Sequence, residues 1–300
     1  ARIDARDELI GQLRRAGRDV HADTPHAELA LHAYHAFGDD FVQHLLGDFA
    51  LVLWDASRKR LLAVRDPLGV RPLYFARLSD GLALASDIAA LLAVPQLSRE
   101  LDRTAVADFL MCGVPLDADA TIYREIRCLQ PGSVLEWNSG QTRIRRYWQL
   151  DYPSEVRFRN RTDYVDRFRE LLGRAVSDRV PQGATAIPLS GGMDSTSIAA
   201  LAVESGRGQP ITAYHVSART LEPDDDEGGY AKAVAHQLGL RYVQQELGDY
   251  ALFDRAASIG TAFPSPAPLL AVHADMVADM EQHHARVLLS GYQGDALFFA

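Results

Sequence analysis

The feature that most constrains the fold is an apolar strand that enters a glycine turn and continues directly into an apolar helix. Residues 189–195 read Leu-Ser-Gly-Gly-Met-Asp-Ser, and we call this segment the glycine turn. Two adjacent glycines let the backbone turn tightly and come close to a ligand. The free amides and the dipole at the start of the next helix favour an anion. The pattern predicts a phosphate-binding turn; an ordinary turn capped by Asp or Ser is the alternative.

Strands and helices alternate through the second half of the chain, which predicts βαβ units and a parallel sheet. The first helix there is amphipathic, and we expect its apolar side to be buried: Tyr164, Phe168, Leu171, Leu172, Ala175 and Val176. The expected strands lie near residues 186–189, 211–216, 241–245 and 286–289. The expected helices lie near residues 162–179, 194–204, 228–238 and 269–282.

The first half reads as one helix followed by many short strands, and therefore as an α+β domain with antiparallel pairing. The helix is expected over residues 27–37, and Asn138-Ser-Gly140 marks a hairpin. Residues 48–55 are apolar between charged ends, which predicts a buried strand. The other strands are expected at 61–64, 73–75, 82–84, 133–137 and 142–148. Residues 151–155 resemble a linker, so we expect domains over residues 1–155 and 156–300.

Composition limits the classes of function. A net charge of −9 over 300 residues argues against a nucleic-acid surface. We find no signal peptide and no apolar run near the ~20 residues that a membrane helix needs. Two cysteines without metal-type spacing are typical of reduced thiols, so we expect a cytoplasmic protein. The chain starts with Ala1 and stops inside an apolar run at Ala300, and we expect a fragment lacking both termini.

Two loops carry the expected chemistry. In the glycine turn, Ser190 and Ser195 supply hydroxyl donors, and Asp194 can hold Mg²⁺ against phosphates. No Walker-type lysine follows; Ser-Gly-Gly-x-Asp-Ser is the pattern of the pyrophosphate loop of N-type ATP-pyrophosphatases. Residues 288–295, which we call the second loop, follow another parallel strand and end at Asp295. Ligands bind at the carboxyl ends of such strands, so Asp194 and Asp295 can share the magnesium; a solvated turn is the alternative.

Two further features of the sequence are an acidic run and a set of scattered histidines. The acidic run over residues 224–227 is either functional or a solvated loop that caps the next helix. The ten histidines lack metal-ligand spacing, and none is expected to bind a metal.

The chain resembles the glutamine-dependent asparagine synthetase family along nearly its whole length. Residues 47–55, Gly-Asp-Phe-Ala-Leu-Val-Leu-Trp-Asp, and residues 65–74, Arg-Asp-Pro-Leu-Gly-Val-Arg-Pro-Leu-Tyr, resemble its glutaminase domain. Three further segments also resemble that glutaminase domain: residues 85–92, Leu129-Gln-Pro-Gly-Ser133 and Tyr147-Trp148. The glycine turn and the second loop resemble its synthetase domain in order and spacing.

This resemblance implies an α+β sandwich of the N-terminal-nucleophile type, a class II amidotransferase domain, followed by an α/β domain of the adenine nucleotide α-hydrolase type. ATP and Mg²⁺ are the implied cofactors, with Asp194 and Asp295 as metal ligands. The implied ATP-binding residues follow the two loops and the second parallel strand: Leu189, Ser190, Gly191, Gly192, Asp194, Ser195, Val216, Ser290 and Gly291.

Several residues depart from the family pattern. Arg2 stands where the family has the Glu that binds glutamine, and Pro25-His26 replaces its Ser-Asp. A cation cannot pair with the ammonium of glutamine, so we expect an inactive glutaminase domain. Tyr292 stands where asparagine synthetases have Glu, whereas β-lactam synthetases have Tyr there. Tyr292 is therefore a candidate catalytic proton acceptor, or it packs over the nucleotide.

The sequence predicts an ATP-dependent amide ligase that adenylates a small-molecule or peptide carboxylate and releases pyrophosphate. Asparagine biosynthesis with nitrogen from glutamine or ammonia ranks first. A specialised enzyme resembling β-lactam synthetases or lasso-peptide cyclases, which use an amine of the substrate, is the alternative. A catalytically silent scaffold of the same fold is a further alternative. The strand-rich first half disfavours an argininosuccinate or GMP synthetase type. A homodimer is compatible with the sequence.

Overall fold

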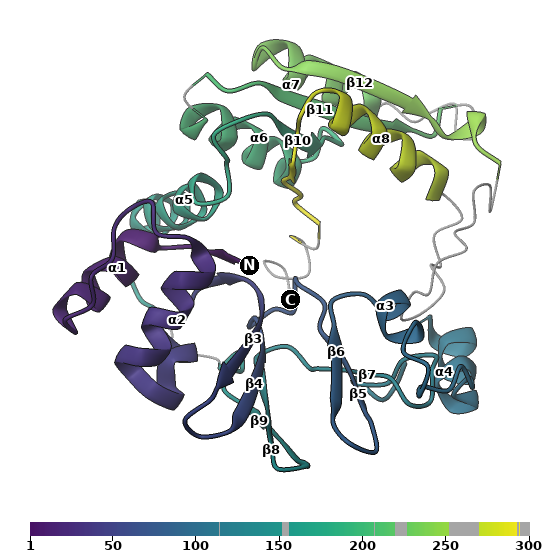
Figure 1. The fold of residues 1–300 in the computed structure, drawn as a ribbon. Helices are drawn as coiled ribbons and strands as arrows, with labels where there is room; N and C mark the ends of the chain where they lie inside the picture. The colour runs from purple at the N-terminus through teal and green to yellow at the C-terminus, as the bar shows by residue number, and fades with distance from the viewer. Residues whose placement is uncertain are drawn as a thin grey trace. The chain divides into compact units, whose positions relative to one another are not determined.

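A computed structural model describes residues 1–113, 115–151, 156–206, 208–219, 227–251, 270–292 and 294 (Figure 1). The chain forms two compact units, and the described part of the first is residues 1–151. The second unit contributes the described residues from 156 onward. The predicted boundary between residues 155 and 156 adjoins the undescribed residues 152–155, so it stays a prediction.

Two antiparallel sheets form the centre of the first unit, as the alternating short strands predicted. The first sheet has the order β3-β4-β8-β9, and the second has the order β6-β5-β7. Leu135 of the first sheet and Phe75 of the second share one buried cluster, so these sheets pack face to face. Their strands are β3 (Ala50–Asp55), β4 (Arg60–Arg65), β5 (Tyr74–Arg77), β6 (Leu82–Ala85), β7 (Arg127–Cys128), β8 (Ser133–Asn138) and β9 (Gln141–Arg146).

The hairpin between β8 and β9 is confirmed. Ser139 and Gly140 have φ angles of 48° and 83°. Positive φ at both central residues is the geometry of a two-residue hairpin turn, which matches the right-handed twist of the strands.

Helices cover the other face of the first sheet. Leu13 of α1 and Leu29 of α2 are fully buried in one cluster with Val64 of β4. The prediction of a helix over residues 27–37 is confirmed, whereas α1, α3 and α4 were not predicted. The helices are α1 (Arg6–Arg15), α2 (His26–Phe37), the 3₁₀ helix η1 (Gly38–His44), α3 (Ile88–Leu92) and α4 (Arg103–Cys112).

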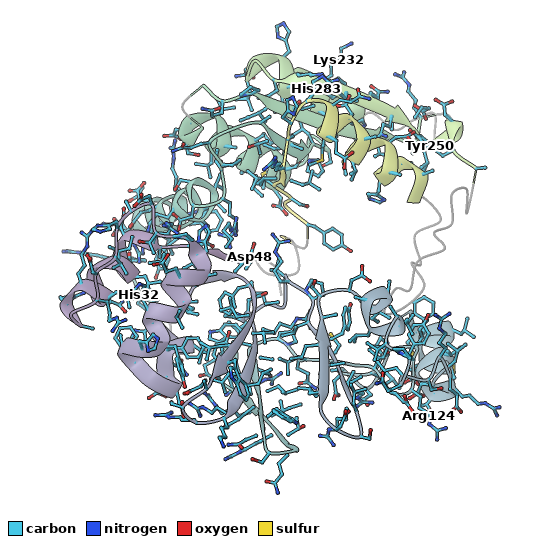
Figure 2. The ribbon with its side chains drawn as sticks, in the orientation of Figure 1. His32, Asp48, Arg124, Lys232, Tyr250 and His283 are labelled. Carbon is cyan, nitrogen blue, oxygen red and sulfur yellow. The ribbon has the colours of Figure 1, made fainter. Side chains whose placement is uncertain are left out.

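The first residues of the chain pair with a short strand of the same unit. β1 (Arg2–Ile3) runs antiparallel to β2 (Gly47–Asp48). The Arg2 guanidinium donates a 2.7 Å hydrogen bond to the carboxylate of Asp48, which is labelled in Figure 2. Arg2 also forms an ion pair with the buried Asp4. This arginine is therefore held by carboxylates of its own unit.

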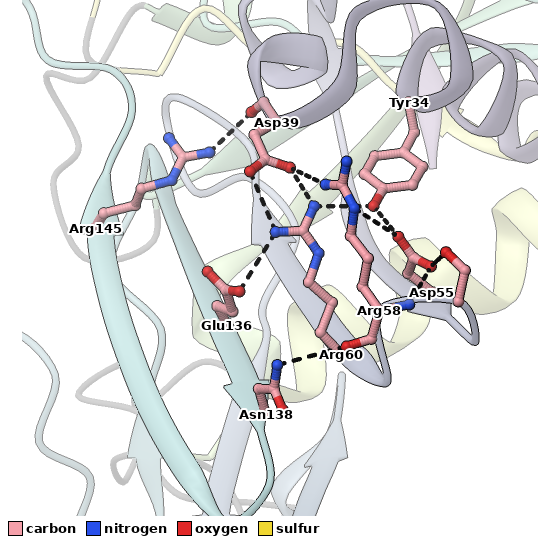
Figure 3. Close-up of polar contacts among 9 residues, drawn as sticks. Tyr34, Asp39, Asp55, Arg58, Arg60, Glu136, Asn138 and Arg145 are labelled. Carbon is pink, nitrogen blue, oxygen red and sulfur yellow. Dashed lines mark hydrogen bonds and ion pairs between the residues drawn. The ribbon is translucent and has the colours of Figure 1, made fainter.

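A buried arginine ties the first sheet to its helical layer (Figure 3). The Arg60 guanidinium donates to the hydroxyl of Tyr34 at 2.9 Å, to Glu136 at 3.4 Å and to Asp39. Asp39 is the main cause that raises the pKa of Arg60 above its ordinary value. The cluster thus neutralises a charge that would otherwise be costly to bury.

Residues 50–55 form β3 as predicted, but the predicted burial of residues 48–55 is wrong for two of the eight side chains. Val52 is 53% exposed and Trp54 is 54% exposed. Leu51 and Leu53 point the other way and pack against the helical cluster. β3 is the edge strand of its sheet, so its outward residues lack a neighbouring strand on one side.

The second unit contains a parallel sheet of order β12-β11-β10-β13, which confirms the predicted βαβ alternation. Ile187 faces a cluster that includes alanines of α6 and α7, whereas Ala186 faces methionines of α8. Both faces of the sheet are therefore covered, as is usual for parallel sheets. The strands are β10 (Thr185–Pro188), β11 (Ile211–Ser217), β12 (Arg241–Glu246) and β13 (Val287–Leu288). The helices are α5 (Arg161–Ser177), α6 (Met193–Ser205), α7 (Glu227–Gln237), η2 (Leu247–Asp249) and α8 (Leu270–Gln282).

The predicted burial of α5 holds only near its end. Val176 is buried and Leu172 packs beside it in the cluster with α6. Tyr164, Phe168 and Leu171 are 43%, 47% and 48% exposed and Ala175 is exposed as well, so their predicted burial is wrong. The pattern identified the apolar face of the helix, but the first turns stay largely exposed, with Phe158 stacked edge-on against Tyr164 at a centroid distance of 4.9 Å. No helix within the described ranges combines the length and the apolar character that crossing a membrane requires.

Candidate functional site

The carboxyl ends of the parallel strands border a pocket of about 1030 Å³, which we call the strand-end pocket. This volume is sufficient for a nucleotide-sized ligand. The predicted residues that line it are Leu189, Ser190, Gly192, Asp194, Ser195, Val216, Ser290, Gly291 and Tyr292. The chain thus has open space where the glycine turn was expected to receive a phosphate tail.

The glycine turn is closed by its own serines. The hydroxyls of Ser190 and Ser195 lie 3.1 Å apart, and the N–H of Ser190 donates to the Ser195 hydroxyl at 3.3 Å. The Gly192 N–H donates to the Ser190 hydroxyl at 3.3 Å, and the Ser195 hydroxyl donates to the Gly192 carbonyl at 3.2 Å. α6 begins at the next residue, Met193. The serines therefore shape the turn; their contact with phosphates stays a prediction.

Gly191 is the position at which only glycine fits. Its φ angle is 83°, in the left-handed region that side chains avoid. A Cβ built there would lie 2.6 Å from the Cβ of Tyr230 and 2.8 Å from the backbone N of Ala231. The first turn of α7 therefore packs directly against the glycine turn.

The two predicted loops meet at Asp194. A Cβ added to Gly291 would lie 3.2 Å from the Asp194 Cβ, and one added to Gly294 would overlap the Asp194 carboxylate. The glycines of the second loop thus let its backbone approach the carboxylate closely. Asp295 lies outside the described residues, so its pairing with Asp194 is not tested.

The donor set in this part of the pocket suits a magnesium ion that is bound mainly by a nucleotide. Within the described residues, no three His, Cys, Asp or Glu side chains gather in a way that could hold a metal. Mg²⁺ commonly uses one or two carboxylates together with substrate phosphates and water. Asp194 fits that role, and the assignment stays a prediction.

The remaining predicted residues lie on the pocket wall. Val216 is 44% exposed at the end of β11, beside Gln245 of β12 in the strand register. The N–H of Tyr292 donates to the Ser290 hydroxyl at 3.1 Å, and the Tyr292 side chain is 84% exposed. An exposed phenol at this place is free to meet a substrate, but no described contact marks it as a proton acceptor.

Sequence reasoning missed several residues of the pocket. His215 and Gln245 line it from the ends of β11 and β12, and Val272, His273 and Met276 line it from α8. The position of the first two at strand ends was an available signal. Glu227 lines the pocket at the start of α7. The rest of the acidic run, residues 224–226, lies outside the described residues.

A polar cluster holds α8 against the strands that form the pocket. The Tyr214 hydroxyl donates to Asp279 at 2.5 Å, and the Arg241 guanidinium donates to Asp279 at 2.6 and 2.9 Å. The bonds from Arg241, followed by that from Tyr214, lower the pKa of Asp279 to about 2. Burial and the bond to Asp279 raise the pKa of Tyr214 to about 12. Asp279 is therefore ionised in the folded second unit near neutral pH.

Replacing Asp279 by Asn should destabilise the second unit at pH 7 by about 1 kcal/mol, since Arg241 is 41% exposed and its ion pair is partly screened. The folded-state pKa lies below the ordinary 3.8, so the stabilisation is complete above about pH 4 and is lost as the pH falls toward 2. Urea unfolding by circular dichroism at pH 7 and pH 2 measures both values. A loss of equal size at both pH values would contradict this.

Tryptophan fluorescence provides the internal control for that experiment. Trp54, Trp137 and Trp148 are the three tryptophans of the chain, and all lie in the first unit. Their unfolding transition should therefore stay unchanged in the Asp279→Asn variant.

In the first unit, an arginine and a neutral histidine occupy the two positions at which the resemblance puts glutamine-binding residues. His26 Nδ1 accepts the backbone N–H of Ile3 at 3.1 Å and lies 3.0 Å from the Arg6 guanidinium. Burial, followed by the charge of Arg6, lowers the pKa of His26. Arg2, at the Glu position of the family pattern, is bound to Asp48 and Asp4. The free carboxylates that would hold an ammonium group are thus replaced at both positions.

Comparison with known protein families identifies two domains. A glutamine amidotransferase domain matches residues 5–148, and an asparagine synthase domain matches residues 167–300. The first match lies within the unit of antiparallel sheets, and the second contains the whole parallel sheet.

Curated relatives have related names. The chain is 30% identical over 249 residues to the glutamine-hydrolyzing asparagine synthetase 3 of Bacillus subtilis, a match that covers 79% of this chain and 40% of that protein. Asparagine synthetase 2 of Bacillus subtilis is 26% identical over 291 residues, covering 91% and 38%. Amidase chyE of Penicillium rubens is 28% identical over 243 residues, covering 77% and 34%. The chain therefore spans less than half the length of these relatives.

Proposed function

Because this chain belongs to the glutamine-dependent asparagine synthetase family, we propose that it is part of an ATP-dependent ligase that forms an amide from a carboxylate and a nitrogen nucleophile. The substrate carboxylate attacks the α-phosphorus of ATP, and pyrophosphate leaves. The nitrogen then attacks the carbonyl carbon and loses a proton, the C–N bond of the amide forms, and AMP leaves with the electron pair of the acyl C–O bond. Asparagine formation from aspartate is the first candidate for this reaction.

The observation that carries the proposal is the meeting of both strand-end loops at Asp194 beside an open pocket. The exposed N-terminus of α6 offers backbone amides and a favourable dipole to the leaving pyrophosphate. Asp194, alone or with Asp295, would hold Mg²⁺, which supplies neutralisation of the pyrophosphate charge when it is bound. We propose that the second unit has the α/β fold of the adenine nucleotide α-hydrolase type, which the parallel sheet with the pocket at its strand ends supports.

ATP–pyrophosphate exchange on the whole protein tests the proposal, because exchange requires reversible adenylation of a carboxylate. Aspartate, glutamate, a larger amino acid and a carboxylate-bearing peptide are supplied separately. Exchange that depends on aspartate supports asparagine formation. Exchange that occurs only with the larger amino acid or the peptide rejects asparagine formation and supports a specialised ligase. Absence of both exchange and ATP binding would support a catalytically silent scaffold.

A specialised ligase that uses an amine of its own substrate is the second candidate. It is favoured by Tyr292, which stands at the position where β-lactam synthetases also have Tyr, and which is exposed at the pocket. In that enzyme the phenol would accept the proton of the attacking amine. Replacement of Tyr292 by Phe separates the two roles, since it keeps the packing and removes the acceptor.

The first unit should fail to supply ammonia from glutamine, because Arg2 and His26 with Arg6 occupy the ammonium-binding positions. With the active carboxylate, ammonium chloride or the substrate amine should therefore give amide product, and glutamine should give none above background. Mass spectrometry of the product, together with an assay for released glutamate, measures both. Release of glutamate would show that the glutaminase is active.

A further inference from the structure

A buried histidine binds the residue at which the glycine turn leaves the sheet. His215 of β11 is 3% exposed, and its Nδ1 atom lies 3.0 Å from the carbonyl oxygen of Leu189. Because a carbonyl oxygen can only accept, Nδ1 carries the proton and donates. The N–H of Leu189 in turn donates to the Tyr214 carbonyl at 2.7 Å. Both backbone polar groups of Leu189 are therefore bonded to β11.

The far side of the imidazole ring is fitted against α7. A Cβ built on Gly228 would lie 3.2 Å from Nε2 of His215, which is tighter than most Cβ contacts, and 3.5 Å from its Cδ2, which is an ordinary contact. The ring also stacks with Tyr242 of β12 at a centroid distance of 6.3 Å and an angle of 18°. Nε2 is buried and has no hydrogen-bond partner among the described residues. The imidazole ring thus fills a space beside Gly228, and a larger residue at position 228 would make this space smaller.

The same turn of α7 also contacts the glycine turn. Tyr230 and Ala231 lie against Gly191, two residues after Leu189. One short stretch of α7 therefore supports both the turn and the histidine that holds its first residue. The strand-end pocket is lined by Leu189, His215 and Glu227, so this support lies at the edge of the candidate site.

We propose that His215 is a positioning residue for nucleotide binding. Its hydrogen bond to the Leu189 carbonyl orients the amides of the glycine turn, and the absence of a side chain at Gly228 leaves the space, or seat, that its ring occupies. That the turn binds a triphosphate rests on the proposed function. The hydrogen bond of His215 and the packing of its ring against Gly228 do not depend on that function. A buried carbonyl that loses its donor is unfavourable, so without the histidine the backbone at Leu189 rotates toward another partner. The turn amides then lose their common direction.

Two substitutions of His215 separate the donor from the volume of the ring. His215→Leu fills most of the seat but has no donor, and should raise the KM for ATP in pyrophosphate exchange about tenfold, with a smaller change in kcat. His215→Asn places an amide N–H near the Nδ1 position and should stay within about threefold of wild type. His236→Asn, at an exposed position of α7, is the matched control and should change nothing.

Gly228→Ala tests the seat. It should raise the KM for ATP in the wild-type background, though less than His215→Leu, because the added Cβ shifts the ring by a few tenths of an ångström. In the His215→Asn background, where the ring is absent, it should have no further effect, and this non-additivity identifies the contact. Equal effects of Gly228→Ala in both backgrounds, or a wild-type KM in His215→Leu, would overturn the proposal.

Nitrogen NMR of His215 in the protein without nucleotide tests the hydrogen bond independently of activity. A protonated Nδ1 and an unprotonated Nε2 are expected, and the opposite tautomer rejects the assignment. If the wild-type protein shows no ATP–pyrophosphate exchange, the proposed function fails. The tautomer and the effect of Gly228→Ala on it then still decide whether His215 holds the turn.

Discussion

Replacing Asp194 by Asn should lower ATP–pyrophosphate exchange by about 100- to 1000-fold, while the second unit stays folded. The substitution keeps the shape of the side chain and removes the charge that would hold Mg²⁺ against the pyrophosphate. Loss of one group that stabilises developing charge costs about 3–4 kcal/mol in a transition state, which corresponds to this range. Asp194 lies where the glycine turn and the second loop converge, whereas Glu227, the other described carboxylate that lines the pocket, stands at the start of α7.

The magnesium dependence distinguishes this role from a structural one. A carboxylate that binds the metal should, when lost, raise the Mg²⁺ concentration needed for half-maximal exchange. A carboxylate that only favours the start of α6 through the helix dipole contributes about 0.3–1 kcal/mol to stability and leaves that concentration unchanged. Glu204→Gln, near the other end of the same helix, removes an equal charge and is the matched control. Wild-type exchange with wild-type Mg²⁺ dependence in Asp194→Asn would refute the assignment.

The parallel sheet could be predicted because its strands are buried on both faces. Ala186 and Ile187 pack against opposite helical layers, so the strand reads as a continuous apolar run between turns. Edge strands give a weaker signal. Val52 and Trp54 are as apolar as core residues, and only the order of strands in the sheet leaves them exposed. Sequence pattern indicates which residues prefer burial, whereas tertiary structure determines what covers them.

The missed helix α4 had end signals rather than clear periodicity. Asp102 accepts hydrogen bonds from the N–H groups of Thr104 and Ala105, and Gly113 ends α4 with a φ angle of 72°. An Asp cap and a terminal glycine are standard signals that bound a helix. Met111 of α4 is 85% exposed, so an amphipathic pattern does not mark this helix.

In the site, the glycine turn could be predicted because its chemistry is local. Glycines, serines and a carboxylate within a few residues define both the backbone path and the ligand type. His215 could not be found in this way, since it bonds a carbonyl 26 residues earlier and its seat is a glycine on another element. Such a contact depends on the parallel register of β10 and β11, which no short motif encodes.

The largest effect on stability is expected from Gly191→Ala. At a φ angle of 83°, a residue with a Cβ loses about 1–2 kcal/mol relative to glycine. The Cβ would also lie 2.8 Å from the backbone N of Ala231, which cannot move aside as a flexible side chain could. Overpacking of this kind costs about 1–3 kcal/mol. We therefore expect the second unit to lose about 2–5 kcal/mol of stability, together with ATP–pyrophosphate exchange.

Gly229→Ala is the control that the chain itself offers, because both changes add one methyl group beside the same turn of α7. A Cβ on Gly229 would meet no atom within 4 Å, and the residue is helical. Alanine there should stabilise the unit by about 0.5–1 kcal/mol, since it reduces the freedom of the unfolded chain. Hydrogen exchange of peptides from β10, β11 and α7 measures both variants within the second unit. If Gly191→Ala and Gly229→Ala shift exchange in the same direction, α7 does not press on the glycine turn, and the close packing inferred for this site is wrong.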